Sequence, residues 1–234
     1  MQDKPFQSRD WKSHPPMISP DYKSTLYRAP KKPLIPLKQS LSELTGPVYG
    51  HESAAAIDTD LTKNAQKTAE AIGERILVAG RVLDENGRAV PHTLVEIWQA
   101  NAAGRYIHVN DQHDAPLDPN FFGAGRCVTD GEGRYKFTTV KPGAYPWGNH
   151  ANAWRPAHIH FSLFGPTIAT RLVTQMFFPG DPLLAYDPIF SSVPAAARNR
   201  LVASFDLGVT KEGFALGYNF DIVLRGRAET PMEA

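Results

Sequence analysis

The sequence predicts an all-β fold, an antiparallel β-sandwich with long loops, an extended N-terminal arm and one short helix. Short segments that alternate apolar and polar residues follow one another from residue 75 onward, and turn-forming residues separate them. Residues 1–72 are rich in proline and show little sustained periodicity. Residues 194–204 alone have a convincing helical composition. We therefore expect an arm over 1–72 and a β-sandwich domain over 73–234.

The arm is too long to be left loose beside a compact domain. We expect it to wrap a surface, either of its own domain or of a partner. A disordered tail is the alternative, but the arm contains apolar residues that can dock. These residues are Trp11, Tyr22, Leu26, Tyr27, Leu34 and Ile35.

The strands of the sandwich are expected in pairs along the chain. RILVAGRVLD at 75–84 alternates as a strand, DENG at 84–87 has Asn-Gly turn chemistry, and HTLVEIWQA at 92–100 returns as the partner strand. A second hairpin follows the same pattern, with GRCVTD, the turn DGEG and RYKFTTV over 125–140. Further strands are expected at HIHFSLF, RLVTQMFF and NFDIVLRG, and the helix is expected at 194–204, with Pro194 near its first turn.

Charge and cysteine content exclude several classes of protein. Lys and Arg number 25 against 24 Asp and Glu, without a basic run, so we expect no nucleic-acid or membrane partner. The single cysteine, Cys127, excludes an intrachain disulfide and a cysteine cage for a metal, and a buried strand position is expected for it. No apolar segment approaches the length of a membrane span, and the start of the chain has no leader-like apolar region. The expected location is the reducing cytoplasm.

The segment RPAHIHF at 155–161 places two histidines on one face of a strand. Alternate side chains of a strand point to opposite faces, so His158 and His160 converge while Ile159 points away. Protonating both rings in these apolar surroundings is costly, and a shared cation removes the need for it. On base rates alone that cation is zinc. The alternative is a pair of strand histidines that each form local hydrogen bonds and bind no metal.

A metal at this pair needs further ligands from neighbouring segments. Asp181 is the nearest carboxylate after the next strand, and a carboxylate is the usual third ligand of ferrous oxygenases. Tyr106 and Tyr145 are a less common choice, because only a strongly Lewis-acidic ion such as ferric iron holds a phenol as phenolate at neutral pH. Taken alone, each tyrosine is more simply interpreted as a packed aromatic residue at a strand end.

Three longer segments resemble the intradiol ring-cleaving dioxygenases. They are GRVLDENGRAVPHTLVEIWQANAAGRY, DPNFFGAGRCVTDGEGRYKFTTVKPGAYPW and WRPAHIHFSLFGP, and the likeness runs from about Glu74 to Arg225. SPDYKST and TGP in the arm resemble the β chain of the family's two-chain members. The resemblance implies a β-sandwich around one mononuclear non-haem iron, Fe(III). The implied ligands are Tyr106, Tyr145, His158 and His160, and Tyr145 is the phenolate that the substrate displaces.

The resemblance also implies roles around the metal. Arg155 and Gln175 would be catalytic, Arg155 by stabilising negative charge on the reacting ring. Substrate-binding positions would be Trp147 and Ile189, as pocket walls, and Tyr22 of the arm, which would reach a substrate carboxylate. Without the resemblance, Arg155 is interpreted as a surface arginine and the other four residues as packing.

The implied reaction is cleavage of 3,4-dihydroxybenzoate (protocatechuate) by O2 to 3-carboxy-cis,cis-muconate, in the β-ketoadipate pathway of aromatic catabolism. The implied partner is a homologous α chain, in α–β protomers of a larger symmetric oligomer. One alternative is a relative that acts on catechol or hydroxyquinol, but those relatives have a helical N-terminal region, which the proline-rich arm does not match. Another is a non-catalytic, transthyretin-like binding sandwich, although all four ligand positions are filled here.

Overall fold

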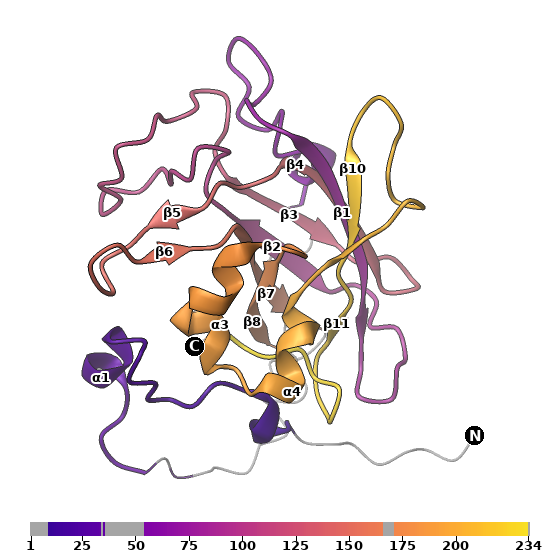
Figure 1. Cartoon of the computed structure of the whole chain (residues 1–234). Coiled ribbons are helices and arrows are strands. Elements are labelled where there is room, and N and C mark those ends of the chain that lie inside the picture. Colours follow the sequence, from indigo (N-terminus) through magenta and orange to yellow (C-terminus); the bar gives the residue numbers. More distant parts are fainter. Residues whose placement is uncertain (1–8, 34, 36–53, 166–170, 234) are drawn as a thin grey trace.

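The computed structural model describes residues 9–33, 35, 54–165 and 171–233. Its body is two β-sheets packed face to face (Figure 1). The first sheet has β1 (Arg75–Leu83) at its centre, with β4 (Arg134–Val140), β10 (Leu216–Asn219), β11 (Ile222–Val223) and, beside β10, β9 (Ser204–Phe205). The second sheet is antiparallel, in the order β3 (Ala124–Val128), β2 (Leu94–Trp98), β7 (His158–Phe164) and β8 (Leu172–Phe177). The sandwich predicted from the sequence is confirmed.

The core lies between the sheets and contains a cluster of aromatic rings. Phe161 of β7 is fully buried, and the rings of Tyr135, Phe137 and Phe220 have their centroids 5.3–5.9 Å from its own. Ile159 is buried in the same core. Because strand residues alternate, His158 and His160 lie on the opposite face of β7, which is also buried. This second buried face of β7 is where the candidate site is built.

The two predicted hairpins are not hairpins. Both tight turns are present, with Gly87 and Gly133 at positive φ of 76° and 72°. However, β1 pairs with β4 and β2 pairs with β3, so each turn joins the two sheets. After the first turn, Val90 N donates to Val82 O at 2.9 Å, and the chain then crosses to the second sheet. The crossing places Val90 in the core between the sheets, whereas a flat hairpin would leave this residue half exposed.

Two further predictions need correction. The strand predicted over 219–226 is interrupted at Phe220, between β10 and β11. Phe220 O accepts from the buried hydroxyl of Tyr135 at 2.5 Å and does not continue a regular ladder. Moreover, β10 and β11 run parallel to β1, so the first sheet is mixed rather than antiparallel.

Helices are more numerous and shorter than predicted. The described residues contain three short α helices: α1 (Ser24–Arg28), α3 (Pro188–Ser192) and α4 (Ala195–Arg198). The predicted helix over 194–204 is reduced to α4 and a 3₁₀ turn at Asn199–Leu201, because Ala203 N donates to Phe177 O of β8 at 2.9 Å and extends the chain. None of the helices in the described part of the chain has the length and apolar character needed to cross a membrane.

Residues 9–33 of the arm lie on the outside of the body, below α3 and α4 in Figure 1. Arg200 Nη1 donates to Ser13 Oγ at 3.0 Å, and Lys23 N donates to Asn149 Oδ1 at 2.9 Å. Of the apolar arm residues named above, four are exposed, and Leu34 lies outside the described residues: the exposed ones are Trp11, Leu26, Tyr27 and Ile35. Nearer the body, Leu61 is fully buried in the core. The boundary at residue 72 remains a prediction.

Candidate active site

The sheet register fixes the surroundings of the two histidines. On β7, His160 lies opposite Trp98 of β2 and Gln175 of β8, while His158 lies opposite Phe177 of β8. The Trp98 and His160 rings stack with centroids 4.7 Å apart and an interplanar angle of 6°. The plane of the His160 ring is therefore set by the neighbouring strand.

Tyr145 reaches the histidines through a short ribbon. It begins β5 (Tyr145–Pro146), which pairs with β6 (Trp154–Arg155), and β6 leads within two residues into β7. The ribbon thus folds the chain back so that Tyr145 Oη lies 3.4 Å from His158 Nε2.

Tyr106 arrives from the loop after β2, and Gly104 makes this approach possible. Gly104 has a positive φ of 78°, and a Cβ at this position would lie 2.2 Å from the carbonyl oxygen of Ala144. Only glycine lets this loop pack directly against the start of β5. The result is that the Tyr106 and Tyr145 rings have centroids 5.4 Å apart.

The four predicted ligands therefore form one cluster. Ring centroids are 4.9 Å apart for His158 and His160, and 6.5 Å apart for Tyr106 and His160. His158 Nδ1 lies 2.7 Å from the carbonyl oxygen of Pro156, which can only accept, so Nδ1 carries the proton and Nε2 has a free lone pair. His160 Nδ1 lies 3.1 Å from Glu233 Oε2, which leaves its Nε2 free in the same way.

The pKa values of Tyr106, Tyr145 and His158 are shifted in the direction that favours the uncharged form. Burial raises the pKa of Tyr106 well above its usual range, with a further contribution from Tyr145, and burial likewise raises the pKa of Tyr145. Burial, together with the nearby Arg155 and His160, lowers the pKa of His158 well below its usual range. Two imidazoles and two phenols bind a cation only if it is acidic enough to displace the phenol protons.

The residues fit ferric iron. Tyr106 Oη is buried and has no hydrogen-bond partner among the described residues, a state that costs about 1–3 kcal/mol and that a bound cation would relieve. In the same part of the chain, no three His, Cys, Asp or Glu side chains form a group that could hold a metal. A metal at this cluster must therefore use phenolates, which select a strongly Lewis-acidic ion over zinc.

Asp181 does not join this cluster. Its carboxylate accepts from Leu183 N at 2.9 Å and from Ala157 N at 3.1 Å, and so it caps the 3₁₀ helix at Pro182–Tyr186 and fixes the turn before β7. The carboxylate ligand considered from the sequence is thus a structural residue.

Arg155 and Gln175 lie behind the cluster. Arg155 is 3% exposed, which excludes a surface arginine. Its Nη2 donates to Gln175 Oε1 at 2.6 Å and to Asp187 Oδ2 at 2.8 Å, and its Nη1 lies 3.3 Å from His158 Nε2. Asp187 also accepts from Ile189 N at 3.1 Å and begins α3. A single buried carboxylate therefore fixes both the arginine and the helix that carries Ile189.

A cavity of about 680 Å³ opens onto the cluster. Tyr106, Tyr145 and His160 line it, together with Trp147. Tyr22 of the arm packs against Trp147, with ring centroids 5.5 Å apart. Ile189 is buried and is not part of this lining, and neither are Arg155 and Gln175. The cluster is thus open to the cavity on one side, and the charged pair Arg155 and Asp187 lies on the opposite, buried side.

Among the residues near the site to which the sequence assigned no role, three are notable. Trp98 and His108 line the cavity, and Glu233 contacts His160. His108 lies two residues from Tyr106, and Trp98 lies near the end of the strand predicted at 92–100, so proximity to the ligands is a signal for both. Glu233 is 73 residues from its partner, and no sequence pattern indicates that contact.

Comparisons with known proteins agree with this geometry. Residues 44–226 match the family described as Dioxygenase, and residues 8–40 match the protocatechuate 3,4-dioxygenase beta subunit N terminal family. The protocatechuate 3,4-dioxygenase β chain of Burkholderia cepacia is 68% identical over 225 residues, which cover 96% of each chain. The α chain from the same organism is 28% identical over 206 residues, which cover 83% of this chain and 96% of that one.

A solved structure supports the fold alone. The crystal structure of 3-chlorocatechol 1,2-dioxygenase from Rhodococcus opacus 1CP has a TM-score of 0.56 and 24% identity, and the match covers 79% of this chain and 72% of that one. The family matches span both the arm and the sandwich, and the β chain of B. cepacia matches nearly end to end. The chain therefore belongs to the intradiol dioxygenase family, within the group of protocatechuate 3,4-dioxygenase β chains.

Proposed function

We propose that this chain is the iron-binding subunit of an intradiol dioxygenase that cleaves protocatechuate with O2 to 3-carboxy-cis,cis-muconate. The observation that carries the proposal is the convergence of Tyr106, Tyr145, His158 and His160 in one cluster, of which all but His158 line the same cavity. Its 68% identity to a protocatechuate 3,4-dioxygenase β chain supports the choice of substrate. The β-ketoadipate pathway of aromatic catabolism is the corresponding setting.

The four donors would hold one Fe(III). Iron would supply the Lewis acidity that keeps both phenols deprotonated and makes a chelated catechol reactive toward O2. His158 and His160 are neutral donors, so two phenolates leave one positive charge on a ferric site. Tyr145 lines the cavity, and its Oη is the donor atom that would accept a proton from an arriving catechol.

Arg155 supplies a fixed positive charge on the buried side of the site. Its guanidinium is held by Asp187 and Gln175, so no reorganisation is needed when negative charge develops on the substrate. Gln175 acts through this hydrogen bond. Arg155 also lies over the Trp147 ring, with Cζ 5.7 Å from the ring centroid, which links the arginine to the wall of the cavity.

The substrate ring is expected to lie along Trp147, with Tyr22 near the carboxylate. Tyr22 contacts Trp147, and Arg28 Cζ lies 5.0 Å from the centroid of the Tyr22 ring, which adds positive charge near this edge of the cavity. Ile189, the second residue of α3, donates its N–H to Asp187 and is expected to act as a wall on that side. The arm would thus contribute to recognition of the ring substituent.

An α chain is the expected partner. The curated relatives include α chains of protocatechuate 3,4-dioxygenase from B. cepacia and Pseudomonas putida, as well as the β chain. The arm exposes Trp11, Leu26 and Tyr27, and apolar residues gathered on one exposed segment favour a protein contact. We infer α–β protomers that assemble into a larger symmetric oligomer.

Cys127 is a buried free thiol whose pKa burial raises to about 12, in keeping with a cytoplasmic protein.

Oxygen uptake tests this function. The chain co-expressed with its homologous α chain should consume one O2 per protocatechuate, at least about 10-fold faster than with catechol, because a site that binds a substituent discriminates against its absence. Product formation is followed by ultraviolet absorbance. Faster turnover of catechol would indicate a catechol or hydroxyquinol dioxygenase instead. An iron-loaded complex that consumes no O2 with any catechol would indicate a binding sandwich.

A further inference from the structure

Residues 229–233 run along β8 and end beside His160. Glu233 N donates to Val173 O of β8 at 2.8 Å. Thr174 Oγ1, also on β8, donates to Pro231 O at 2.7 Å. These bonds fix the backbone of the segment to the strand that lies next to β7. The position of the Glu233 side chain is therefore determined by the sheet that carries the histidines.

Glu233 determines the orientation of one candidate ligand. Its Oε2 lies 3.1 Å from His160 Nδ1, and a carboxylate accepts from this nitrogen, so His160 Nε2 faces the other three rings. Stacking on Trp98 fixes the ring plane but does not distinguish the two ring flips. His158 has a local anchor in the Pro156 carbonyl, two residues away. His160 depends on a residue that is distant in the sequence.

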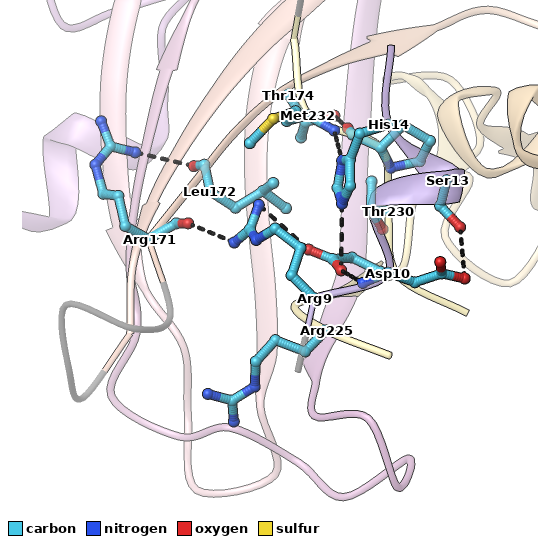
Figure 2. A network of polar contacts seen from close by, with 12 residues as sticks. Arg9, Asp10, Ser13, His14, Arg171, Leu172, Thr174, Arg225, Thr230 and Met232 are labelled. Carbon is cyan, nitrogen blue, oxygen red and sulfur yellow. Dashed lines mark hydrogen bonds and ion pairs between the residues drawn. The ribbon is translucent and has the colours of Figure 1, made fainter. Parts of the chain in front are cut away.

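The arm holds the same segment from outside (Figure 2). His14 Nδ1 accepts from Met232 N at 3.0 Å, while His14 Nε2 lies 3.3 Å from Glu229 Oε2. Arg9 Nη1 lies 3.2 Å from Glu229 Oε1, and Asp10 N donates to Glu229 Oε2 at 3.2 Å. Figure 2 shows Arg9, Asp10 and His14 beside Thr230 and Met232 of this segment.

The contact between the arm and this segment is buried. His14 is 3% exposed and Glu229 is fully buried. A buried carboxylate without partners is strongly destabilising, so Glu229 stays inside only while the arm residues are in place. His14 contacts the segment at Glu229 and at Met232, the residue before Glu233. Movement of the arm would therefore remove one of the supports of the backbone that places Glu233, while the bonds to β8 would remain.

We propose that Glu233 is a positioning residue for His160, and that the contact of His14 with residues 229–233 holds Glu233 in place. The N-terminal arm would then support the metal site from the side opposite the cavity, in addition to contributing Tyr22. This inference rests on the proposed iron site.

The test compares iron retention in the full chain, co-expressed with the α chain. Glu233→Ala should speed the transfer of ferric iron to a chelator about 10–100-fold and shift the phenolate-to-iron absorption band, because outer partners of ligating histidines typically contribute that much to metal affinity. Glu233→Gln should recover most of the retention, since its amide oxygen still accepts from Nδ1. Glu212→Ala, at an exposed carboxylate, is the matched control and should behave as the wild type.

The arm contact is tested in the same assay. His14→Ala should change iron release in the same direction as Glu233→Ala, and the double variant should release iron no faster than Glu233→Ala alone. His14→Gln, which can accept from Met232 and donate to Glu229, should restore retention if His14→Ala folds poorly. If the effects of the two substitutions on iron release add in the double variant, His14 does not act through Glu233 and its proposed role is refuted.

Two outcomes separate this inference from the proposed function. If Glu233→Ala keeps wild-type release kinetics and an unshifted band, the positioning role is refuted while the iron site stands. If the wild-type complex takes up no ferric iron, the proposed function fails and this inference fails with it.

Discussion

The variant His160→Ala is expected to lose most of its iron. His160 is one of the two nitrogen donors in the cluster, and its ring is fixed by Trp98 and Glu233. The loss of affinity should exceed the roughly 10–100-fold that removal of an outer partner costs. Iron per chain after gel filtration gives the result, and His150→Ala, at an exposed loop histidine, is the control.

Tyr145→Phe should behave differently from His160→Ala. Tyr145 lines the cavity and is expected to leave the metal when substrate binds, so the variant should keep part of its iron while substrate binding or product release becomes abnormal. Iron content and substrate-induced spectral changes, measured on the same samples, separate the two effects. Equal iron loss in both variants would contradict the displaceable role of Tyr145.

Arg155→Gln is expected to lower turnover roughly 10²–10³-fold, the usual effect of removing one preorganised group that stabilises developing charge. It should also destabilise the fold by about 3–5 kcal/mol, because Asp187 is fully buried and loses its cationic partner. Steady-state kinetics and denaturant unfolding give the two quantities. Arg134→Gln, at an exposed arginine, should change neither.

A second substitution distinguishes these two effects. Asp187→Asn in the Arg155→Gln background removes the unpaired charge and keeps a side chain that can cap α3 at Ile189 N. Stability should recover in the double variant while turnover stays low. Recovery of both would show that Arg155 acts through the fold alone and would contradict its electrostatic role.

Sequence reasoning located the histidine pair because the alternation of strand residues is a local property. From the residues alone the two tyrosines were a less common choice of ligand, and the resemblance assigned them to the site, as it did Arg155, since nothing in local periodicity connects Tyr106 with His158. Turn residues at Gly87 and Gly133 correctly marked the turns but not the pairing, which depends on which sheet each following strand joins. The contact of Glu233 with His160 depends on tertiary packing and has no local signal.

The most direct measurement is the iron content and visible spectrum of the purified α–β complex. Tyr106, Tyr145, His158 and His160 should hold one ferric ion per chain and give a broad phenolate-to-iron band, and Tyr106→Phe should weaken that band. A colourless, iron-free wild-type complex would contradict the assignment of this cluster as a ferric site. A band of unchanged position and intensity in Tyr106→Phe would contradict the place of this tyrosine in it.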